Sequence, residues 1–419
     1  MEPQPRVVVS ASWRENSISA LSRAALARGQ LRERYVVDDR FVAHLALLKG
    51  GFTAPARAHA RRARHRSTSR AMGGDHTVGR GPELLRILGA VGGSRLPVDV
   101  GNDLWKAAFD QRVARRVRRL AVEHPFRPTD VVIGMPGSSA ATFAASGKAT
   151  LVLDAIDSHP REHNHLLAQA YPDGRARDET YPEGLVRRIE RELELADLVL
   201  VPSRLAAEGM RRHGVPASKL GLFPYAVALD TFVPAAAPVT PRARPSLLCV
   251  AQVSYRKGIP MLLEAARRAP GVDVRVAGPV FAPAVTAGAP ANVRFLGTLD
   301  QAELAREYAA ADAFVLPSLD DCFGLVVTEA AAAGLPLLVT ATTGAVEVVA
   351  DLPQTTVLDA FDVAGTAELL AATPRLDAET RLAHAAAFRS LDQTFLSWDR
   401  YADAVLDSAD ALTRGLRAA

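Results

Sequence analysis

The 419-residue chain has two cysteines, Cys249 and Cys322, which lie far apart among apolar residues. They give neither a disulfide framework nor the ligand spacing of a metal site, so we interpret both as small buried side chains in a reducing compartment. No segment approaches the roughly 18 uninterrupted apolar residues of a membrane span. The N-terminus has no apolar signal region and leads within a few residues into Val7-Val8-Val9. We therefore expect a cytoplasmic protein.

Net charge is also small, at +4, but the positive residues are unevenly distributed. Six arginines and two histidines fall in the segment Arg57–Arg70. Three interpretations of this segment stay open: a solvated loop, a peripheral contact with the anionic inner face of a membrane, and a polyanion site. Aromatic residues are absent from the segment, so the base stacking typical of single-strand binders is missing and we expect no nucleic-acid partner.

Short apolar runs alternate with helical stretches, which is typical of βαβ units and predicts an α/β fold of doubly wound parallel sheets. The length suits two domains. A proline-rich stretch at 235–245 can be neither helix nor central strand, so we interpret it as a linker. The predicted parts are an N-terminal domain at 1–235, a second domain at 246–395 and a final helical segment at 396–419.

Individual elements can be assigned within these parts. The predicted strands are 6–10, 131–134, 150–153 and 198–201, then 246–252, 273–277, 293–296, 313–316 and 337–340. The predicted helices are 18–28, 185–196, 260–268, 301–310 and 326–333, followed by a mostly helical stretch at 377–412. Two such domains create a cleft at the carboxyl ends of both sheets, where ligands of open α/β sheets bind.

One segment of the second half runs from a strand through an acidic loop to a glycine and a helix. Gly324 lets the backbone approach a ligand closely, and the helix after it offers unpaired N–H groups that suit a diphosphate. Asp321 on the loop and Glu329 inside the helix are spaced to reach hydroxyl groups at the two ends of one nucleotide sugar. The alternative is that Asp320 and Asp321 only cap the helix and Glu329 faces solvent.

A second segment places adjacent cations after a buried strand, in Ser254-Tyr255-Arg256-Lys257-Gly258. Arg256 and Lys257 at the carboxyl end of a strand are placed to hold a diphosphate and to stabilise the charge that grows on it. A solvated Arg-Lys pair is the other interpretation.

Together these segments resemble glycosyltransferase family 4, retaining enzymes with the GT-B fold. Residues 253–260 look like the family's donor-phosphate loop, and Asp321 to Glu329 looks like its Glu-x7-Glu signature. Ser158-His159-Pro160-Arg161-Glu162 looks like the loop that faces the transferred sugar. The final helix resembles the segment that crosses back to the first domain. The resemblance predicts the GT-B architecture, two Rossmann-like domains facing each other across a cleft. It implies that the domain at 1–235 binds the acceptor and that the domain at 246–395 binds the donor.

The resemblance also implies roles for single residues. Arg256, Lys257, Asp321 and His159 would be catalytic. The nucleotide sugar would be bound by Glu329, Gly324, Leu325, Phe323, Ser254 and Val326. His159 could instead cap a loop. No metal or other cofactor is expected, because the clamp consists of protein cations.

The sequence departs from the family pattern at several positions. Asp321 stands in place of the first Glu of the signature, and Asp320 is close enough to share its role. Gln252 stands where many members have Arg, which leaves Arg256 and Lys257 as the cation pair. The glycine-rich first loop of many members is absent, and residues 10–17 occupy its place.

The resemblance implies a hexosyltransferase-type enzyme that moves a sugar from a nucleoside diphosphate to a hydroxyl acceptor, with retention of anomeric configuration. The acceptor would be a small molecule, a glycan or a lipid-linked precursor. Other GT-B enzymes, such as a phosphorylase or an epimerase, and a non-catalytic sugar-nucleotide-binding protein remain as alternatives.

Overall fold

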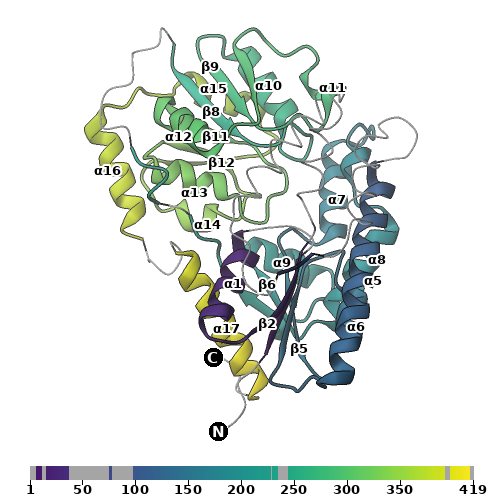
Figure 1. Ribbon diagram of the computed structural model, residues 1–419. Coiled ribbons are helices and arrows are strands. Elements are labelled where there is room, and N and C mark those ends of the chain that lie inside the picture. The colour runs from purple at the N-terminus through teal and green to yellow at the C-terminus, as the bar shows by residue number, and fades with distance from the viewer. Residues whose placement is uncertain are drawn as a thin grey trace, which may run out of the picture.

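The computed structural model describes residues 6–11, 16–36, 75–77, 98–227, 229–234, 244–391 and 397–415. These ranges form two α/β domains, one above the other in Figure 1. The predicted linker, apart from its last two residues, and the basic segment Arg57–Arg70 lie outside the described residues.

The N-terminal domain is built on a seven-stranded sheet in the order β3-β2-β1-β4-β5-β6-β7, and every pairing is parallel. Its strands are β1 (Val7–Ala11), β2 (Leu31–Val36), β3 (Asp75–Thr77), β4 (Val131–Gly134), β5 (Thr150–Asp154), β6 (Leu198–Val201) and β7 (Leu220–Leu222). The central strands β4 and β5 are buried at every position, because helices cover both faces of a parallel sheet.

The C-terminal domain repeats this plan with a six-stranded parallel sheet in the order β10-β9-β8-β11-β12-β13. Its strands are β8 (Ser246–Val250), β9 (Asp273–Ala277), β10 (Val293–Gly297), β11 (Ala313–Leu316), β12 (Leu337–Thr340) and β13 (Thr355–Leu358). In both sheets the strand order reverses beside the first strand, and ligands of doubly wound sheets bind at that switch point.

Helices cover both sheets. Those of the first domain are α1 (Asn16–Ala27), α5 (Val98–Glu123), α6 (Ala140–Ala145), α7 (Pro160–Ala170), α8 (Glu183–Leu195) and α9 (Arg204–Arg212). Those of the second are α10 (Ile259–Arg268), α11 (Pro283–Thr286), α12 (Gln301–Ala310), α13 (Leu325–Ala332), α14 (Val346–Val349), α15 (Val363–Ala371) and α16 (Ala378–Arg389). Helices α5, α6 and α8 lie on one side of the first sheet (Figure 1).

The last helix, α17 (Trp398–Thr413), follows the second domain in sequence but packs against α1 of the first. Figure 1 shows the two helices side by side on the face of the sheet opposite α5. Tyr401, Val405 and Ala409 are buried at spacings of one helical turn, which gives α17 the apolar stripe that this contact needs. The C-terminal segment therefore joins the two domains a second time.

The predicted elements agree with the structure in type, with boundary shifts of one or two residues. The strand predicted at 246–252, for example, ends at Val250. Strands β2, β3, β7 and β13 were not predicted. Leu31-Arg32-Glu33-Arg34-Tyr35-Val36 is too polar for the apolar run that marks a central strand, and β2 lies near the edge of the sheet. Helix α5 was not predicted either, because charged residues interrupt its apolar spacing.

Gly258 permits the close contact between two loops of the C-terminal domain, the one after β8 and the one after β11. Its φ is +65°, and a Cβ atom there would lie 1.8 Å from the carbonyl oxygen of Pro317. Gly258→Ala should therefore lower the unfolding free energy by about 2 kcal/mol or more, from left-handed strain and displaced backbone. Gly271→Ala is the matched control, because a Cβ there meets no atom within 4 Å. Equal urea-denaturation midpoints for the two variants would contradict this contact.

Candidate functional site

The site is built from two loops at the carboxyl ends of adjacent strands, 251–258 after β8 and 317–324 after β11. The amide of Leu319 donates to the carbonyl oxygen of Arg256 over 2.9 Å, and Gly258 packs against Pro317. Since β8 and β11 are hydrogen-bonded neighbours, their loops emerge together. The two segments singled out in the sequence are therefore in direct contact.

Lys257 and Asp321 form an ion pair between these loops, each side chain only 12% exposed. The backbone before Lys257 is fixed, because its amide donates to the Ser254 hydroxyl oxygen over 3.3 Å. Ion pairs shielded from water are screened little by salt, and loss of one partner leaves an uncompensated charge. The ammonium group is thus held at the acidic loop instead of extending into solvent.

Arg256 also contacts the acidic loop 317–324. Its Nη1 donates to the carbonyl oxygen of Asp320 over 3.1 Å. Burial by itself would lower the pKa of Arg256, but the nearby carboxylates of Asp157, Asp321 and Asp320 outweigh it and raise the pKa. The guanidinium therefore stays charged and balances a group of acids, and it is not a solvated surface arginine.

Helix α13 begins directly after the acidic loop. Gly324 adopts a φ of +85° at its N-cap, where no side chain caps the helix. The first-turn amides of Leu325 and Val326 have no acceptor within the helix, because N–H groups at a helix start point outward along the axis. A Cβ on Gly324 would lie 3.4 Å from Oδ2 of Asp321. The ion pair and the positive end of the helix are therefore adjacent.

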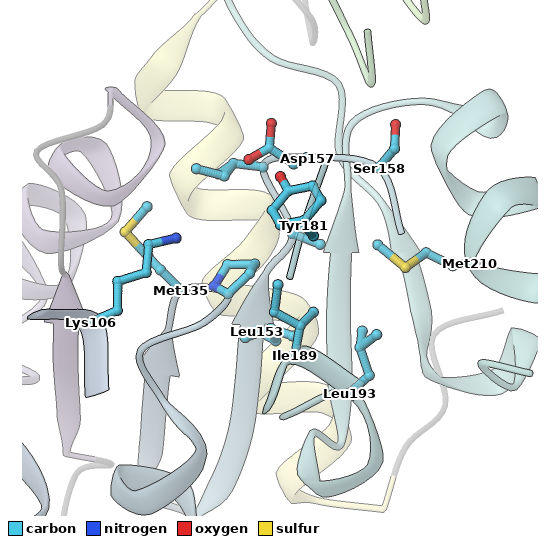
Figure 2. A pocket seen from close by; sticks show the side chains of 12 residues that line it. Lys106, Met135, Leu153, Asp157, Ser158, Tyr181, Ile189, Leu193 and Met210 are labelled. Carbon is cyan, nitrogen blue, oxygen red and sulfur yellow. The ribbon is translucent and has the colours of Figure 1, made fainter. Parts of the chain in front are cut away.

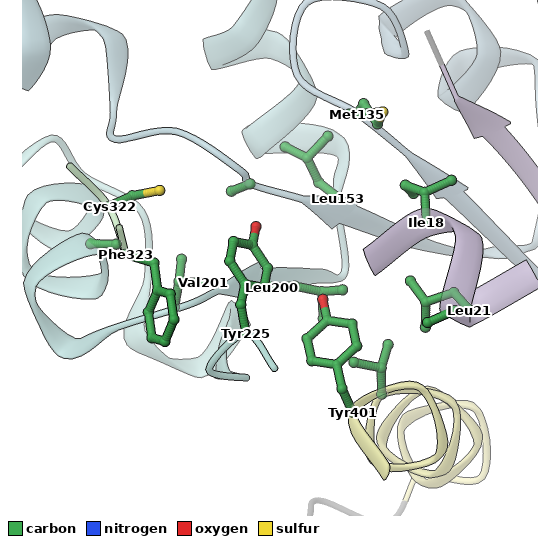
Figure 3. Packing of buried hydrophobic residues seen from close by; sticks show 14 of the residues in the cluster. Ile18, Leu21, Met135, Leu153, Leu200, Val201, Tyr225, Cys322, Phe323 and Tyr401 are labelled. Carbon is green, nitrogen blue, oxygen red and sulfur yellow. The ribbon is translucent and has the colours of Figure 1, made fainter. Parts of the chain in front are cut away.

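The side chain of Phe323 is buried behind the acidic loop. Its side chain is 1% exposed and stands edge-on to Tyr225, with ring centroids 5.5 Å apart. Figure 3 shows Phe323 beside Tyr225, which in turn faces Tyr401 of α17. The phenyl ring therefore anchors the acidic loop to the aromatic cluster between the domains.

Glu329 sits one turn into α13, where it accepts a hydrogen bond from the Tyr308 hydroxyl over 2.9 Å. Burial raises the pKa of Glu329 to about 7, although the Tyr308 hydrogen bond opposes this shift. The carboxyl group therefore titrates near neutral pH, unlike an exposed glutamate.

Asp320 bridges the two domains. Its Oδ1 accepts from the Ser158 hydroxyl over 2.5 Å, and its Oδ2 lies 2.6 Å from Nδ1 of His163 on α7. Burial would raise the pKa of Asp320, but His163, Arg256 and Ser158 lower it overall. Asp320 and Asp321 therefore have different partners. Asp320 contacts the first domain, and Asp321 contacts Lys257 on the loop 251–258.

Glu179 connects the first domain to the loop 251–258, which bears Arg256 and Lys257. Its two carboxylate oxygens accept from the backbone amides of Tyr255 and Arg256 over 2.8 and 2.9 Å. Its own carbonyl oxygen lies 2.9 Å from Nε2 of His163. The loop that bears Lys257 is thus fixed from both domains.

His159 is the N-cap residue of α7. Its Nδ1 accepts from the amide of Arg161 over 3.3 Å, and its ring stacks on His213 at 4.6 Å. Burial, and then the charge of His213, lower the pKa of His159 to about 4, so its ring is neutral at physiological pH. In this arrangement His159 is a helix cap, and its contact with a sugar stays a prediction.

A pocket of about 60 Å³ opens beside Asp157 and Ser158 at the carboxyl ends of β4 and β5, and it can hold a few water molecules. In Figure 2, Asp157 and Tyr181 lie toward one end of it, and Ile189 and Leu193 lie toward the other. The pocket therefore joins a polar rim, next to the acidic loop, to an apolar floor.

Of the predicted site residues, the structure brings together Ser254, Arg256, Lys257, Asp321 and Gly324, with the backbone that follows. The sequence interpretation missed His163 and Glu179. His163 could have been found, because it lies one helical turn after His159 and so shares its side of α7. No local pattern marks Glu179. Within the ranges that the structure describes, no three His, Cys, Asp or Glu side chains group as metal ligands.

Comparison with known proteins bears on the C-terminal domain first. Residues 236–378 match the family model described as Glycosyl transferases group 1. A D-inositol 3-phosphate glycosyltransferase from Mycobacterium sp. is 30% identical over 254 residues, which are 55% of this chain and 58% of that protein. The chain thus spans less than two thirds of the curated relative it matches.

Solved structures match over nearly the whole length. Sucrose-phosphate synthase from Thermosynechococcus elongatus has a TM-score of 0.65 at 17% identity, covering 99% of this chain and 100% of that one. An Anabaena protein in complex with UDP and glucose has a TM-score of 0.60 at 13% identity, covering 97% and 99%. The predicted fold is confirmed: the protein has two Rossmann-like domains in the GT-B arrangement.

Titration of Glu329 gives a pH test of the site. A carboxyl whose pKa rises from 4.5 in the unfolded chain to about 7 in the folded one binds more protons when folded. Its contribution to stability is therefore present at low pH and is lost as pH rises through this window. The unfolding free energy of the unaltered protein should fall by about 1–3 kcal/mol across this window because of Glu329, and Glu329→Gln should remove that fall. Urea denaturation of both proteins between about pH 5 and pH 8 measures it, and parallel curves would contradict the assignment.

Proposed function

We propose that the chain is a retaining, hexosyltransferase-type glycosyltransferase. It transfers a sugar from a nucleoside-diphosphate sugar to a hydroxyl acceptor. The family match and the named relatives support sugar transfer in general. The solved Anabaena protein in complex with UDP and glucose supports a nucleotide-sugar donor.

The observation that carries the proposal is the position of Lys257. The ammonium of Lys257, which is shielded from water, and the first turn of α13 both lie beside Asp321. Both would stabilise the two negative charges of a diphosphate, the ammonium by its charge and the helix by its outward N–H groups. The sugar would then extend toward Asp321 and the pocket beside Asp157.

The proposed reaction is a same-face displacement. The bond between the anomeric carbon and the diphosphate oxygen breaks while the acceptor oxygen attacks from the side of the leaving group. Lys257 and the α13 amides stabilise the charge that develops on the diphosphate, and this stabilisation grows toward the transition state. The diphosphate can take up the proton that the acceptor hydroxyl loses. Asp321 would hold sugar hydroxyls and Glu329 the ribose, whose hydroxyls suit carboxylate acceptors.

Binding of the donor requires Lys257 to exchange partners. In the structure its ammonium is paired with Asp321, and in the complex it would contact the diphosphate while Asp321 turns to the sugar. Arg256 has a different part, because its guanidinium is engaged with the carbonyl of Asp320. It would keep the group of three acids compatible with an anionic ligand by offsetting their charge.

Replacement of Lys257 tests the proposal directly. Lys257→Ala should lower the rate of transfer on the order of 100- to 1,000-fold, because it removes a charge aimed at the leaving group. Product formation is followed as release of nucleoside diphosphate from a panel of nucleotide sugars with hydroxyl acceptors. Lys148→Ala, at an exposed position of the first domain, is the control.

Two outcomes would count against the proposal. Transfer by Lys257→Ala at the rate of the unaltered protein would exclude the predicted clamp. Binding of nucleotide sugars by the unaltered protein without transfer or hydrolysis would favour a non-catalytic binding protein. A melting temperature measured for each variant separates lost chemistry from lost folding.

Replacement of Glu329 tests the nucleotide end of the site. Glu329→Gln should weaken binding of the preferred nucleoside diphosphate by about 10- to 100-fold, the value of a hydrogen bond to a charged group. It should leave the choice of sugar unchanged, because Glu329 is assigned to the ribose. Titration calorimetry measures the affinity, with exposed Glu368→Gln of α15 as the control. Unchanged affinity would remove Glu329 from the nucleotide site.

A further inference from the structure

The long helix α5 carries five exposed arginines that are not used by the site described above. They are Arg112, Arg115, Arg116, Arg118 and Arg119. No ion pair joins any of them to a carboxylate within the part of the chain that the structure describes. The inward face of the same helix is built differently, with Trp105, Phe109 and Val113 buried in the core.

Several exposed arginines on other helices have acidic partners. Arg187 pairs with Glu183 on α8 over 3.3 Å, and Arg191 pairs with Glu194 over 2.8 Å. Arg211 on α9 and Arg267 on α10 also pair with a glutamate three residues earlier. Such pairs one turn apart are the usual way in which an exposed helix balances its charge. Among the residues that the structure describes, the exposed face of α5 forms no such pairs.

The unpaired arginines lie along one face of the helix. Arg112, Arg115, Arg116 and Arg119 follow the i, i+3, i+4, i+7 spacing that aligns side chains on one side. They span about 10 Å of helix at 1.5 Å per residue. Between Leu104 and the end of the helix, the one exposed acid is Glu123, because Asp110 faces inward and caps α6. We name the four arginines Arg112, Arg115, Arg116 and Arg119 the α5 basic face.

Apolar side chains accompany the basic face. Val122, one turn after Arg118 and Arg119, is 85% exposed, and Leu104 near the other end is 52% exposed. Their spacing of eighteen residues, five turns of helix, puts both on the arginine side of α5. Figure 1 shows α5 at the outer side of the N-terminal domain, with its long axis along the surface.

This combination favours a lipid surface over a nucleic acid. Basic side chains with exposed aliphatic groups between them suit the headgroup region of an anionic bilayer, where the charges meet phosphate and the aliphatic groups meet acyl chains. The aromatic residues of the described part of α5, Trp105 and Phe109, are buried and cannot stack on bases. The helix also packs against α6 and does not protrude as a groove-reading helix must.

We propose that the α5 basic face is a docking surface for an anionic phospholipid bilayer, which would bind the protein peripherally through its N-terminal domain. None of the helices in the described ranges combines the length and apolar character of a membrane span. Attachment through α5 would thus rest on surface charge and shallow insertion of Val122. The proposal is independent of the proposed enzymatic function.

Vesicle sedimentation tests the proposal with the full-length protein. Binding to phosphatidylcholine vesicles that contain phosphatidylglycerol should exceed binding to pure phosphatidylcholine and should fall as salt is added. The test variant replaces four arginines: Arg112→Gln, Arg115→Gln, Arg116→Gln and Arg119→Gln. Its partition coefficient should fall by about fivefold for each arginine, several hundredfold together.

The control variant removes the same charge from paired arginines: Arg187→Gln, Arg191→Gln, Arg211→Gln and Arg267→Gln. It should keep most of the binding, which separates a local docking face from an effect of net charge. Equal loss in both variants would overturn the proposal, as would equal binding of the unaltered protein to charged and neutral vesicles. Tighter binding to duplex or single-stranded oligonucleotides than to vesicles, lost in the test variant, would assign the face to nucleic acid. Melting temperatures of both variants confirm that they are folded.

Discussion

The proposed donor site depends on the ion pair between Lys257 and Asp321. It joins the loops that follow β8 and β11, and the close approach of Gly258 to Pro317 brings those loops near enough for it to form. The pair stands beside the uncapped start of α13, so a fixed cation and a set of outward N–H groups share one location. Without this contact the cation would be an ordinary surface lysine, and the helix start would have no charge beside it to hold a diphosphate.

The first domain holds this arrangement in place. Asp320 reaches Ser158 and His163 of that domain, while the carboxylate of Glu179 accepts from the amides of Tyr255 and Arg256. The aromatic contact of Phe323 with Tyr225, and the return of α17 to α1, connect the same loops to the first domain by apolar packing. The contact between the domains and the positions of the loops 251–258 and 317–324 are thus coupled. A ligand that exchanges one of these partners would alter the contact between domains.

Much of the fold could be predicted because its signals are local. Apolar runs such as Val131–Gly134 and Ala313–Leu316 are buried on both faces, and alternation with helices predicts parallel sheets. The site was predictable where glycine, cations and acids follow a strand in sequence, as around Lys257 and Gly324. It was not predictable where partners come from another domain. Nothing near Asp320 in sequence indicates His163 or Ser158, and His159 attracted attention although its ring caps α7. The polar strand β2 was missed because its place in the sheet depends on neighbouring strands.

A crystal structure grown with the nucleoside diphosphate that most raises the melting temperature would test the central claim most directly. The account predicts the diphosphate between the ammonium of Lys257 and the amides of Leu325 and Val326, with Asp321 released from the lysine and turned toward the sugar position. Density for the diphosphate elsewhere, with the pair of Lys257 and Asp321 intact, would contradict it.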